Sequence, residues 1–225
     1  MCDRIVLPYG KIICPPCEPK LKTIKDPYCL KCGKPLSNEG KSLCDRCSIA
    51  PHDFDECRSA LLYDDTMRRS IYRFKYDGRK EYAVYFGQKM AEVLGEKIKT
   101  LHADAIIPVP MYKGKEKKRG FNQASLLARE LSYHLNIPVY ENIIIREKST
   151  KIMRSLGARE RENNLKKAFK MVPNSVKLYD VIIVDDIYTT GSTADAVAKV
   201  MRESGVRRVF VASLSTGKIE SQMED

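Results

Sequence analysis

Two adjacent carboxylates and a run of small hydroxyl residues form the stretch of this sequence with the most specific chemistry. Asp185 and Asp186 precede residues 188–193, which we call the phosphate loop: Tyr188, Thr189, Thr190, Gly191, Ser192 and Thr193. Carboxylates accept hydrogen bonds from sugar hydroxyls. The first N–H groups of a helix lack partners and, together with the positive end of the helix dipole, bind phosphate. The stretch therefore predicts a site for a ribose 5-phosphate.

A strand and a helix have to position these groups. Residues 181–184 are four consecutive β-branched apolar residues, which predict a strand buried on both faces, as in a parallel sheet. Residues 194–203 have the pattern of a helix, and junctions of this kind bind ligands in open α/β sheets. The alternative is a buried strand with an acidic end and an ordinary helix cap. We favour the ligand site, because no cap needs two acids and so long a hydroxyl-rich loop.

The rest of the C-terminal region predicts alternating strands and helices. The predicted strands are 59–63, 105–110, 139–145, 166–172 and 206–214, and the predicted helices are 67–76, 81–99 and 124–135. This alternation predicts an α/β domain over residues 58–225, with a mostly parallel sheet and right-handed crossovers. In the helix 67–76, one side carries Met67, Ile71, Tyr72 and Phe74. The opposite side is basic, and we expect it to be solvated: Arg68, Arg69, Arg73 and Lys75.

Cysteine pairs set residues 1–57 apart as a separate module. Six of the eight cysteines form three Cys-x-x-Cys knuckles, at 14 and 17, 29 and 32, and 44 and 47. A knuckle presents two thiolates to a tetrahedral zinc, and two knuckles complete its shell. Zinc binding would supply the folding free energy of so small a module, on the order of 10 kcal/mol per site.

The pairing of these knuckles is open. If neighbouring knuckles pair, the second and third complete one zinc shell, made of Cys29, Cys32, Cys44 and Cys47. The first knuckle then forms a second shell that is one ligand short, made of Cys2, Cys14 and Cys17. A residue upstream of this chain, Cys57 or water would fill that gap. The alternative pairs the first knuckle with the third. We expect one tightly bound zinc and a second zinc bound weakly or not at all.

The charge points to polyanionic partners. The net charge is +11, and the cysteine module is near neutral, so the basic excess lies in residues 58–225. The partner is therefore a phosphorylated small ligand or a nucleic acid. No apolar run is long enough to span a bilayer, and residues 1–20 lack a signal-peptide core, so we expect a cytoplasmic protein. His52, His102 and His134 lie outside every motif, and we expect structural or surface roles for them.

Residues 181–193 resemble the binding motif of the type I phosphoribosyltransferases. In that family, two acidic residues hold the ribose hydroxyls of phosphoribosyl pyrophosphate (PRPP), and the loop wraps its 5-phosphate. Nearly the whole chain resembles the ComF family of competence proteins. The matching segments are Phe74-Lys75-Tyr76-x-Gly78, Pro108-Val109-Pro110, Arg119-Gly120-Phe121-Asn122-Gln123, Arg161-x-x-Asn164-Leu165-x-x-Ala168-Phe169 and residues 185–193. One departure is Met153, where that family usually carries glutamine.

The resemblance implies a double zinc ribbon followed by a type I phosphoribosyltransferase fold, with a link to DNA uptake or DNA-associated metabolism. It also implies Zn²⁺ in the ribbon, PRPP as ligand and Mg²⁺ bound with the PRPP. Residues 113–123 predict a basic loop leading into a helix, and its pyrophosphate-binding candidates are Lys118, Arg119 and Asn122. Residues 146–161 predict a mobile loop that closes as a lid, and the lid candidates are Lys151, Arg159, Arg161 and Asn164.

Three functions stay open at this point. The first is an enzyme that transfers a phosphoribosyl group with release of pyrophosphate, in which Asp185 and Asp186 stabilise the charge that develops on the ribose. The second is a PRPP sensor without turnover. The third is an adaptor of the DNA-uptake machinery, beside a DNA-uptake helicase, that binds single-stranded DNA through basic loops and the aromatic rings of Tyr72, Tyr76 and Tyr82. An intact PRPP motif argues against a pure adaptor, and turnover would separate the enzyme from the sensor. The acceptor leaves no spacing signature.

Overall fold

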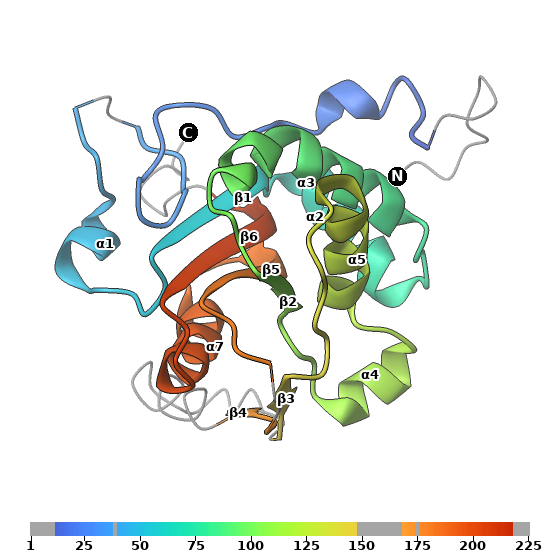
Figure 1. The fold of residues 1–225 in the computed structure, drawn as a ribbon. Helices are drawn as coiled ribbons and strands as arrows, with labels where there is room; N and C mark the ends of the chain where they lie inside the picture. The colour runs from blue at the N-terminus through green and yellow to red at the C-terminus, as the bar shows by residue number, and fades with distance from the viewer. Residues whose placement is uncertain (1–11, 38–39, 148–167, 174–175, 218–225) are drawn as a thin grey trace, which may run out of the picture.

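A four-stranded parallel sheet forms the centre of the computed structural model (Figure 1). The structure describes residues 12–37, 40–147, 168–173 and 176–217, so that Cys2, Met153 and all four lid candidates lie outside the described residues: Lys151, Arg159, Arg161 and Asn164. The strand order is β1-β6-β5-β2, and all neighbours are parallel. The strands are β1 (Glu56–Leu62), β2 (Ala105–Pro108), β5 (Asp180–Tyr188) and β6 (Arg208–Thr216). The predicted α/β class with a mostly parallel sheet is confirmed.

β5 extends four residues beyond the strand that the apolar run predicted. The run ends at Val184, but the strand continues through Asp185 and Asp186 to Tyr188. It does so because β6 runs beside it as far as Thr216, which lies opposite Tyr188. Ladder hydrogen bonds on this side therefore hold the two acidic residues within a strand, which is a more rigid support than a loop.

Helices cover both faces of the sheet (Figure 1). The even-numbered β5 residues Ile182 and Val184 face one layer, which consists of α2 (Asp65–Tyr76), α3 (Tyr82–Lys99) and α5 (Gln123–Leu135). The odd-numbered residues Val181 and Ile183 face α7 (Ser192–Glu203) together with part of the cysteine module. This alternation is the two-residue period of a strand buried on both faces. In the described part of the chain, the helices are too short or too polar to cross a membrane.

The apolar stripe of α2 is confirmed except at Tyr72. Met67, Ile71 and Phe74 are buried, whereas Tyr72 is 58% exposed. Tyr72 follows Ile71 by one residue, which turns it about 100° around a helix of 3.6 residues per turn. Its neighbour along the helix surface is Tyr76, four residues later, and their rings lie 4.9 Å apart between centroids.

The segments beyond β2 differ from the predicted ones. Residues 113–119 form a helix, α4 (Lys113–Arg119), where we predicted a loop. It lacks an apolar stripe, so hydrophobic periodicity gives no signal, but its last turn carries three basic residues that suit the negative end of the helix dipole. Of the strand predicted at 139–145, Val139 forms a single parallel bridge with Ile106 of β2, and β3 (Ile144–Arg146) pairs antiparallel with β4 (Phe169–Met171), which lies within the described part of the strand predicted at 166–172.

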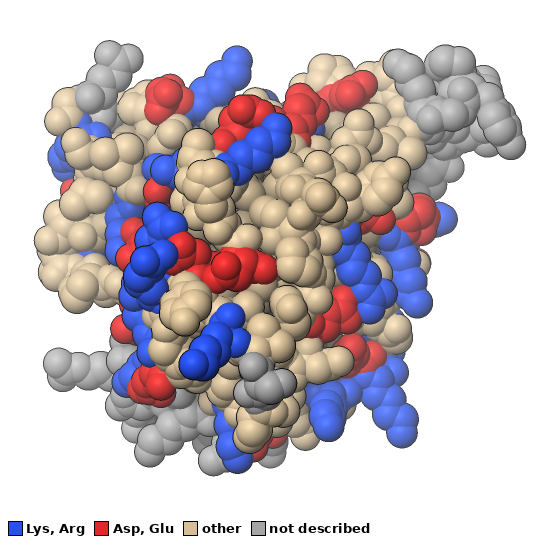
Figure 2. All heavy atoms as spheres, in the orientation of Figure 1, with Lys and Arg blue, Asp and Glu red and all other residues tan. Residues whose placement is uncertain are grey.

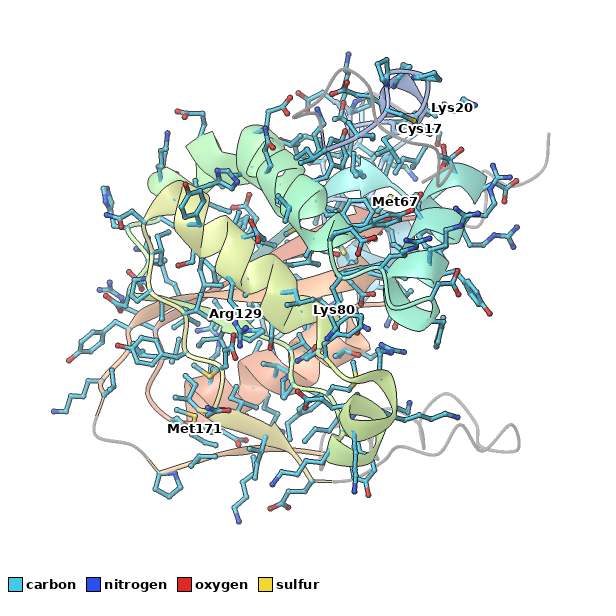
Figure 3. All side chains as sticks on the ribbon, turned by 90° about the vertical axis from the view of Figure 1, so that its right-hand side faces the viewer. Cys17, Lys20, Met67, Lys80, Arg129 and Met171 are labelled. Carbon is cyan, nitrogen blue, oxygen red and sulfur yellow. The ribbon has the colours of Figure 1, made fainter. Side chains whose placement is uncertain are left out.

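The cysteine module lies along two sides of the domain. Its first part, with the short helix η1 (Glu18–Lys20), packs Cys14 and Cys17 against the α3 layer. Its second part, with α1 (Asp45–Ile49), packs Cys29, Cys32 and Cys44 with the α7 layer. Figure 3 shows Cys17 and Lys20 at the opposite end of the molecule from Met171 in β4. The two parts of the module therefore contact different cores.

Candidate functional site

The side chains of Asp185 and Asp186 lie on opposite faces of the sheet. Because side chains alternate along a strand, Asp186 shares the α2 face with Val184, and its Oδ2 forms an ion pair with Nζ of Lys75. Asp185 lies on the other face, where its charge interacts with that of Arg146. Its Oδ1 accepts a hydrogen bond of 2.8 Å from the backbone N–H of Asp186. The two carboxylates thus meet different partners at the carboxyl end of a central strand.

The environment of Asp185 favours its protonated form. Burial, followed by the neighbouring carboxylate of Asp186, raises the pKa of Asp185 to about 8, although the positive charge of Lys75 acts in the opposite direction. The ligand-free environment therefore shifts Asp185 toward its protonated form, in which the side chain can donate one hydrogen bond. A strongly perturbed carboxyl group at the ligand-binding edge of a parallel sheet marks a candidate functional group.

Lys75 is a site residue whose role the sequence analysis missed. We predicted that it belongs to a solvated basic face, but its side chain is only 18% exposed and pairs with Asp186, which is 13% exposed. The signal that could have found it is the segment Phe74-Lys75-Tyr76-x-Gly78, because the buried Phe74 fixes the rotation of α2. A lysine in this place neutralises one carboxylate of the acidic pair, Asp185 and Asp186, before any ligand binds.

Replacing Lys75 with methionine is expected to destabilise the protein by about 3 kcal/mol, because Asp186 would keep a mostly buried charge without its partner. Chemical denaturation measures the free energy of unfolding. Lys89→Met is the matched control, since Lys89 is 17% exposed but its partner Glu92 is 63% exposed, and such surface pairs contribute about 0–1 kcal/mol. Equal losses in the two variants would contradict a special role for the Lys75 pair.

The phosphate loop joins β5 to the start of α7. Thr189 and Thr190 are exposed, and the Thr190 hydroxyl lies 2.9 Å from that of Ser192. Gly191 precedes α7 in the N-cap position and offers no capping side chain. The first N–H groups of α7 therefore face the loop with little competition, apart from a long contact of 3.5 Å from Ser192 N–H to the Thr190 hydroxyl. Such a helix start suits a phosphate.

The side chain of Tyr188 packs in the core beside the phosphate loop. Its side chain is 4% exposed, its ring meets the edge of Phe54, and burial raises the pKa of its hydroxyl well above the usual range. Of the six residues assigned to phosphate binding, Tyr188 is thus the one whose side chain lies in the core. Any contact it makes with a ligand comes through its backbone.

Gly191 is constrained both by its backbone and by its neighbours. Its φ of +85° lies in the left-handed region, and a Cβ there would come within 2.5 Å of the Tyr188 hydroxyl and 3.0 Å of Cε1 of His52. Gly191→Ala is therefore expected to destabilise the protein by roughly 2–4 kcal/mol, from backbone strain and overpacking together. Gly205→Ala is the control, because Gly205 has a φ of +93° and open space around it. Equal shifts of the melting temperature in the two variants would contradict the expected steric conflict of the new Cβ with Tyr188 and His52.

The three pyrophosphate candidates lie in different environments. Lys118 is exposed on α4. Arg119 stacks over the ring of Tyr76 at 4.9 Å and donates to Oε1 of Gln123 at 2.6 Å. Asn122 is buried, and its side chain caps α5 and donates to the Val109 carbonyl at 3.0 Å. Asn122 therefore fixes the start of α5 against the end of β2, while the other two keep their charges near the surface.

A cavity of about 560 Å³ lies beside Asn122, between α4 and β3. Its lining combines aromatic, amide and charged groups, including Tyr112, Glu141 and Arg146. Neither Lys118 nor Arg119 is part of this lining, nor are Asp185 and Asp186. The cavity is thus adjacent to the predicted site and is not the ribose site itself.

Four cysteines form a cluster suited to zinc. The sulfur atoms of Cys29, Cys32, Cys44 and Cys47 all lie within 4.8 Å of one another, and within the described ranges this is the one group of three or more side chains able to hold a metal. A hydrogen bond from the Cys32 thiol lowers the pKa of Cys29 to about 4, and the same bond raises the pKa of Cys32. Four cysteine sulfur atoms this close together are the ligand set of a structural zinc site.

This cluster decides the pairing of the knuckles. The second and third knuckles come together, so the alternative that pairs the first knuckle with the third is wrong. Cys14 and Cys17 pack with the other core, and Cys57 is buried with the four-cysteine cluster, not with the first knuckle. Gly33, directly after Cys32, has the positive φ of +69° that the tight knuckle turn requires.

His52 also has a role that the sequence analysis missed. Its side chain is 2% exposed and lies between a carboxylate of Asp195, in the first turn of α7, and the sulfur of Cys47. Asp195 lies 143 positions away, and Cys47 belongs to the third knuckle, so residue spacing gave no signal for these contacts. The expectation of a structural role is correct, but the histidine connects two sites.

Comparison with known proteins gives close relatives over most of the chain. A family model described as a double zinc ribbon domain matches residues 1–48. Competence protein F of Haemophilus influenzae is 33% identical over 212 residues, covering 90% of each chain. DNA utilization protein YhgH of Escherichia coli is 30% identical over 209 residues, covering 88% of each. Competence protein ComFC of Bacillus subtilis is 30% identical over 202 residues, covering 86% of this chain and 79% of that protein.

Solved structures similar to this one include phosphoribosyltransferases. A purine phosphoribosyltransferase of Pyrococcus horikoshii gives a TM-score of 0.38 at 22% identity, covering 59% of this chain and 74% of that one. An orotate phosphoribosyltransferase of Aeropyrum pernix gives a TM-score of 0.37 at 21% identity, covering 71% and 68%. These likenesses concern the fold alone.

Proposed function

Since this chain belongs to the ComF family of competence proteins, we propose that it is a PRPP-binding phosphoribosyltransferase-like protein that acts in DNA uptake or DNA-associated metabolism. The observation that carries the proposal is the junction of β5 and α7. There, the acidic pair lies two residues before a phosphate loop that leads into a helix without a capping side chain. A sugar phosphate needs both parts, hydroxyl acceptors and phosphate donors, at one edge of a sheet.

In this proposal, the 5-phosphate accepts hydrogen bonds from the N–H groups at the start of α7 and from the hydroxyls of Thr190 and Ser192. The ribose hydroxyls donate to Asp185 and Asp186. Mg²⁺, bound mainly by oxygens of the substrate, would neutralise the pyrophosphate, and the nearby carboxylates are donors that suit it. Lys118 and Arg119, on and beside the exposed face of α4, are the groups available to the leaving pyrophosphate.

Transfer breaks the bond between ribose C1 and the pyrophosphate oxygen, which leaves with the electron pair. The acceptor's lone pair forms the new bond to C1, and the acceptor then loses a proton. Positive charge develops on the ribose in between, and fixed carboxylates nearby stabilise it. We name no protein nucleophile, because none is required for this step.

The test is turnover by the full-length protein. PRPP and Mg²⁺ are supplied with a panel of nucleobases and amines, and released pyrophosphate is measured by a coupled assay. Pyrophosphate release with one acceptor class supports the enzyme. PRPP binding without release with any acceptor supports the sensor, and failure to bind PRPP rejects both.

A second candidate function is binding of single-stranded DNA, and one surface favours it. Tyr72 and Tyr76 are 58% and 61% exposed on α2, with their rings tilted by 47° to each other, and Arg119 lies over the ring of Tyr76. Figure 2 shows Lys and Arg side chains over the right and lower right of the molecule, where α2 and α4 lie in Figure 1, with acidic residues among them. Exposed aromatic rings between cations are the combination that holds unpaired bases.

Binding of single-stranded DNA is expected to weaken steeply with salt. Replacing three of the four exposed lysines of α4 with alanine is expected to flatten the slope of log affinity against log salt by about 2, since each phosphate contact contributes about 0.7. The lysines are Lys115, Lys117 and Lys118. The control removes three exposed lysines on α3 and α7: Lys97, Lys99 and Lys199. Fluorescence anisotropy over a salt series measures the slopes, and an unchanged slope would place α4 off the DNA path.

A further inference from the structure

A buried histidine connects the four-cysteine cluster to the start of α7. Nδ1 of His52 lies 2.9 Å from Oδ2 of Asp195, and its Nε2 lies 3.5 Å from Sγ of Cys47. The ring is almost fully enclosed, with 2% of the side chain exposed, and Asp195 is 19% exposed. One side chain therefore contacts both a sulfur of the metal cluster and the helix on which the phosphate loop depends.

The residues after His52 strengthen this connection. The backbone N–H of Asp53 donates to Oδ1 of Asp195 at 2.9 Å. The ring of Phe54 stacks on the imidazole, with 4.5 Å between centroids, and the same ring meets the edge of Tyr188 at 6.1 Å. Residues 52–54 thus lie under both ends of the phosphate loop, next to Tyr188 at its beginning and to α7 at its end.

Contacts from the second knuckle fix the same segment from the other side. The Nζ of Lys31 donates to the Phe54 carbonyl and lies 5.4 Å from the centre of its ring. The Lys31 carbonyl in turn accepts from the N–H of Cys57 at 2.8 Å. Gly33 approaches β1 so closely that a Cβ would lie 2.6 Å from the Cys57 carbonyl oxygen. The knuckle between Cys29 and Cys32 therefore packs directly on the segment that supports the loop.

We propose that His52 is a positioning residue that couples zinc binding to the phosphate loop. Zinc held by the four-cysteine cluster fixes Cys47, His52 then fixes Asp195, and the start of α7 is held in the geometry that receives a phosphate. The zinc-loaded protein consequently binds its phosphate ligand more tightly than the zinc-free protein. The proposal rests on the proposed PRPP site for the identity of that ligand.

Because coupling free energies are reciprocal, PRPP also tightens zinc binding by the factor by which zinc tightens PRPP binding. Couplings between sites in proteins are typically about 5–150-fold. A purely structural zinc, needed only to fold the ribbon, would not transmit this effect through His52. The distinction can be measured with and without PRPP.

The first measurement needs no ligand. Amide hydrogen exchange of residues 190–196 is followed in the full chain, loaded with zinc and after zinc removal by a chelator. We expect exchange to accelerate at least about fivefold on zinc removal, the lower end of typical couplings. We also expect His52→Ala to exchange fast even with zinc bound, while the exposed histidine variant His134→Ala behaves as wild type. Unchanged exchange in zinc-loaded His52→Ala would overturn the proposal.

The second measurement uses PRPP with Mg²⁺ as the probe and reads the equilibrium partition of zinc between the protein and a chromogenic chelator. Saturating PRPP is expected to raise the zinc affinity about 5–150-fold in the wild type and to have no effect in His52→Ala. Asp195→Asn keeps an oxygen for the Asp53 N–H and serves as the second variant, should the alanine variant fail to fold. PRPP that binds without changing the zinc affinity overturns the coupling alone. Absence of PRPP binding rejects the proposed function instead, and the exchange experiment then decides the coupling.

Discussion

Replacing Asp185 and Asp186 together with asparagine is expected to abolish measurable PRPP binding while the fold stays intact. Each carboxylate lost removes charge-assisted hydrogen bonds to ribose hydroxyls, worth about 1.5–3 kcal/mol. The double variant therefore loses roughly 3–6 kcal/mol, or about 10²–10⁴-fold in affinity. Calorimetric titration of PRPP with Mg²⁺ measures the affinity, and circular dichroism checks the fold.

The matched control removes two exposed acidic side chains that lie outside β5. Asp65→Asn with Glu96→Gln is suitable, because these side chains are 84% and 90% exposed and form only surface ion pairs. PRPP affinity is expected to stay within severalfold of wild type in this control. Equal affinity of the acidic-pair variant and wild type would remove the basis for the ribose site.

The raised pKa of Asp185 adds a pH dependence to this result. Ribose hydroxyls donate better to an ionised carboxylate, so PRPP affinity is expected to rise with pH through about 8 in the wild type. The double variant lacks this group and supplies the baseline for ionisation of PRPP itself. The stability of the folded protein follows the opposite trend. The pKa of Asp185 is higher in the folded than in the unfolded protein. The contribution of Asp185 to the free energy of unfolding is therefore complete below about pH 4 and is lost as the pH rises through about 8.

Cys29→Ser is expected to eliminate tight zinc binding and to unfold the part of the cysteine module around the four-cysteine cluster. A shell of three thiolates holds zinc far more weakly than four, and binding to such a site supplies on the order of 10 kcal/mol of folding free energy. Zinc per chain is measured by mass spectrometry after mild chelation. We expect one retained zinc per chain in wild type and none in the variant.

Cys14→Ser provides the contrast for this result. Cys14 packs against the other core, away from the four-cysteine cluster, so the variant is expected to keep the tight zinc. Two zincs retained equally by wild type would contradict the expectation that the shell of Cys2, Cys14 and Cys17 is incomplete. So would loss of the tight zinc in Cys14→Ser but not in Cys29→Ser.

The central strand, the helix after the loop and the three Cys-x-x-Cys knuckles could be predicted because their signals are local. Four β-branched residues predict the buried part of β5, and regular spacing of cysteines predicts the knuckles, whereas their pairing stayed open until the structure brought the second and third together. The length of β5 could not be predicted, because the acidic pair ends the apolar run while pairing with β6 continues the strand. α4 was missed for a similar reason, since its seven residues carry no apolar stripe.

The contacts that complete the site join residues that are far apart in the sequence, so no local pattern reveals them. Lys75 reaches Asp186 from a different helix, and His52 meets Asp195 across 143 positions. In both cases tertiary packing turns a titratable side chain toward the site. The neighbouring Phe74 and Phe54, both fully buried, set these orientations.

The most direct measurement of the central claim is a crystal structure of the full chain with PRPP and Mg²⁺. We expect the 5-phosphate at the N–H groups of residues 190–193, with the ribose hydroxyls on Asp185 and Asp186. We also expect the ion pair of Lys75 with Asp186 to stay beside the ribose, because Asp186 remains in β5. A PRPP molecule bound elsewhere, for example in the cavity between α4 and β3, or density for the phosphate away from the start of α7, would contradict the claim.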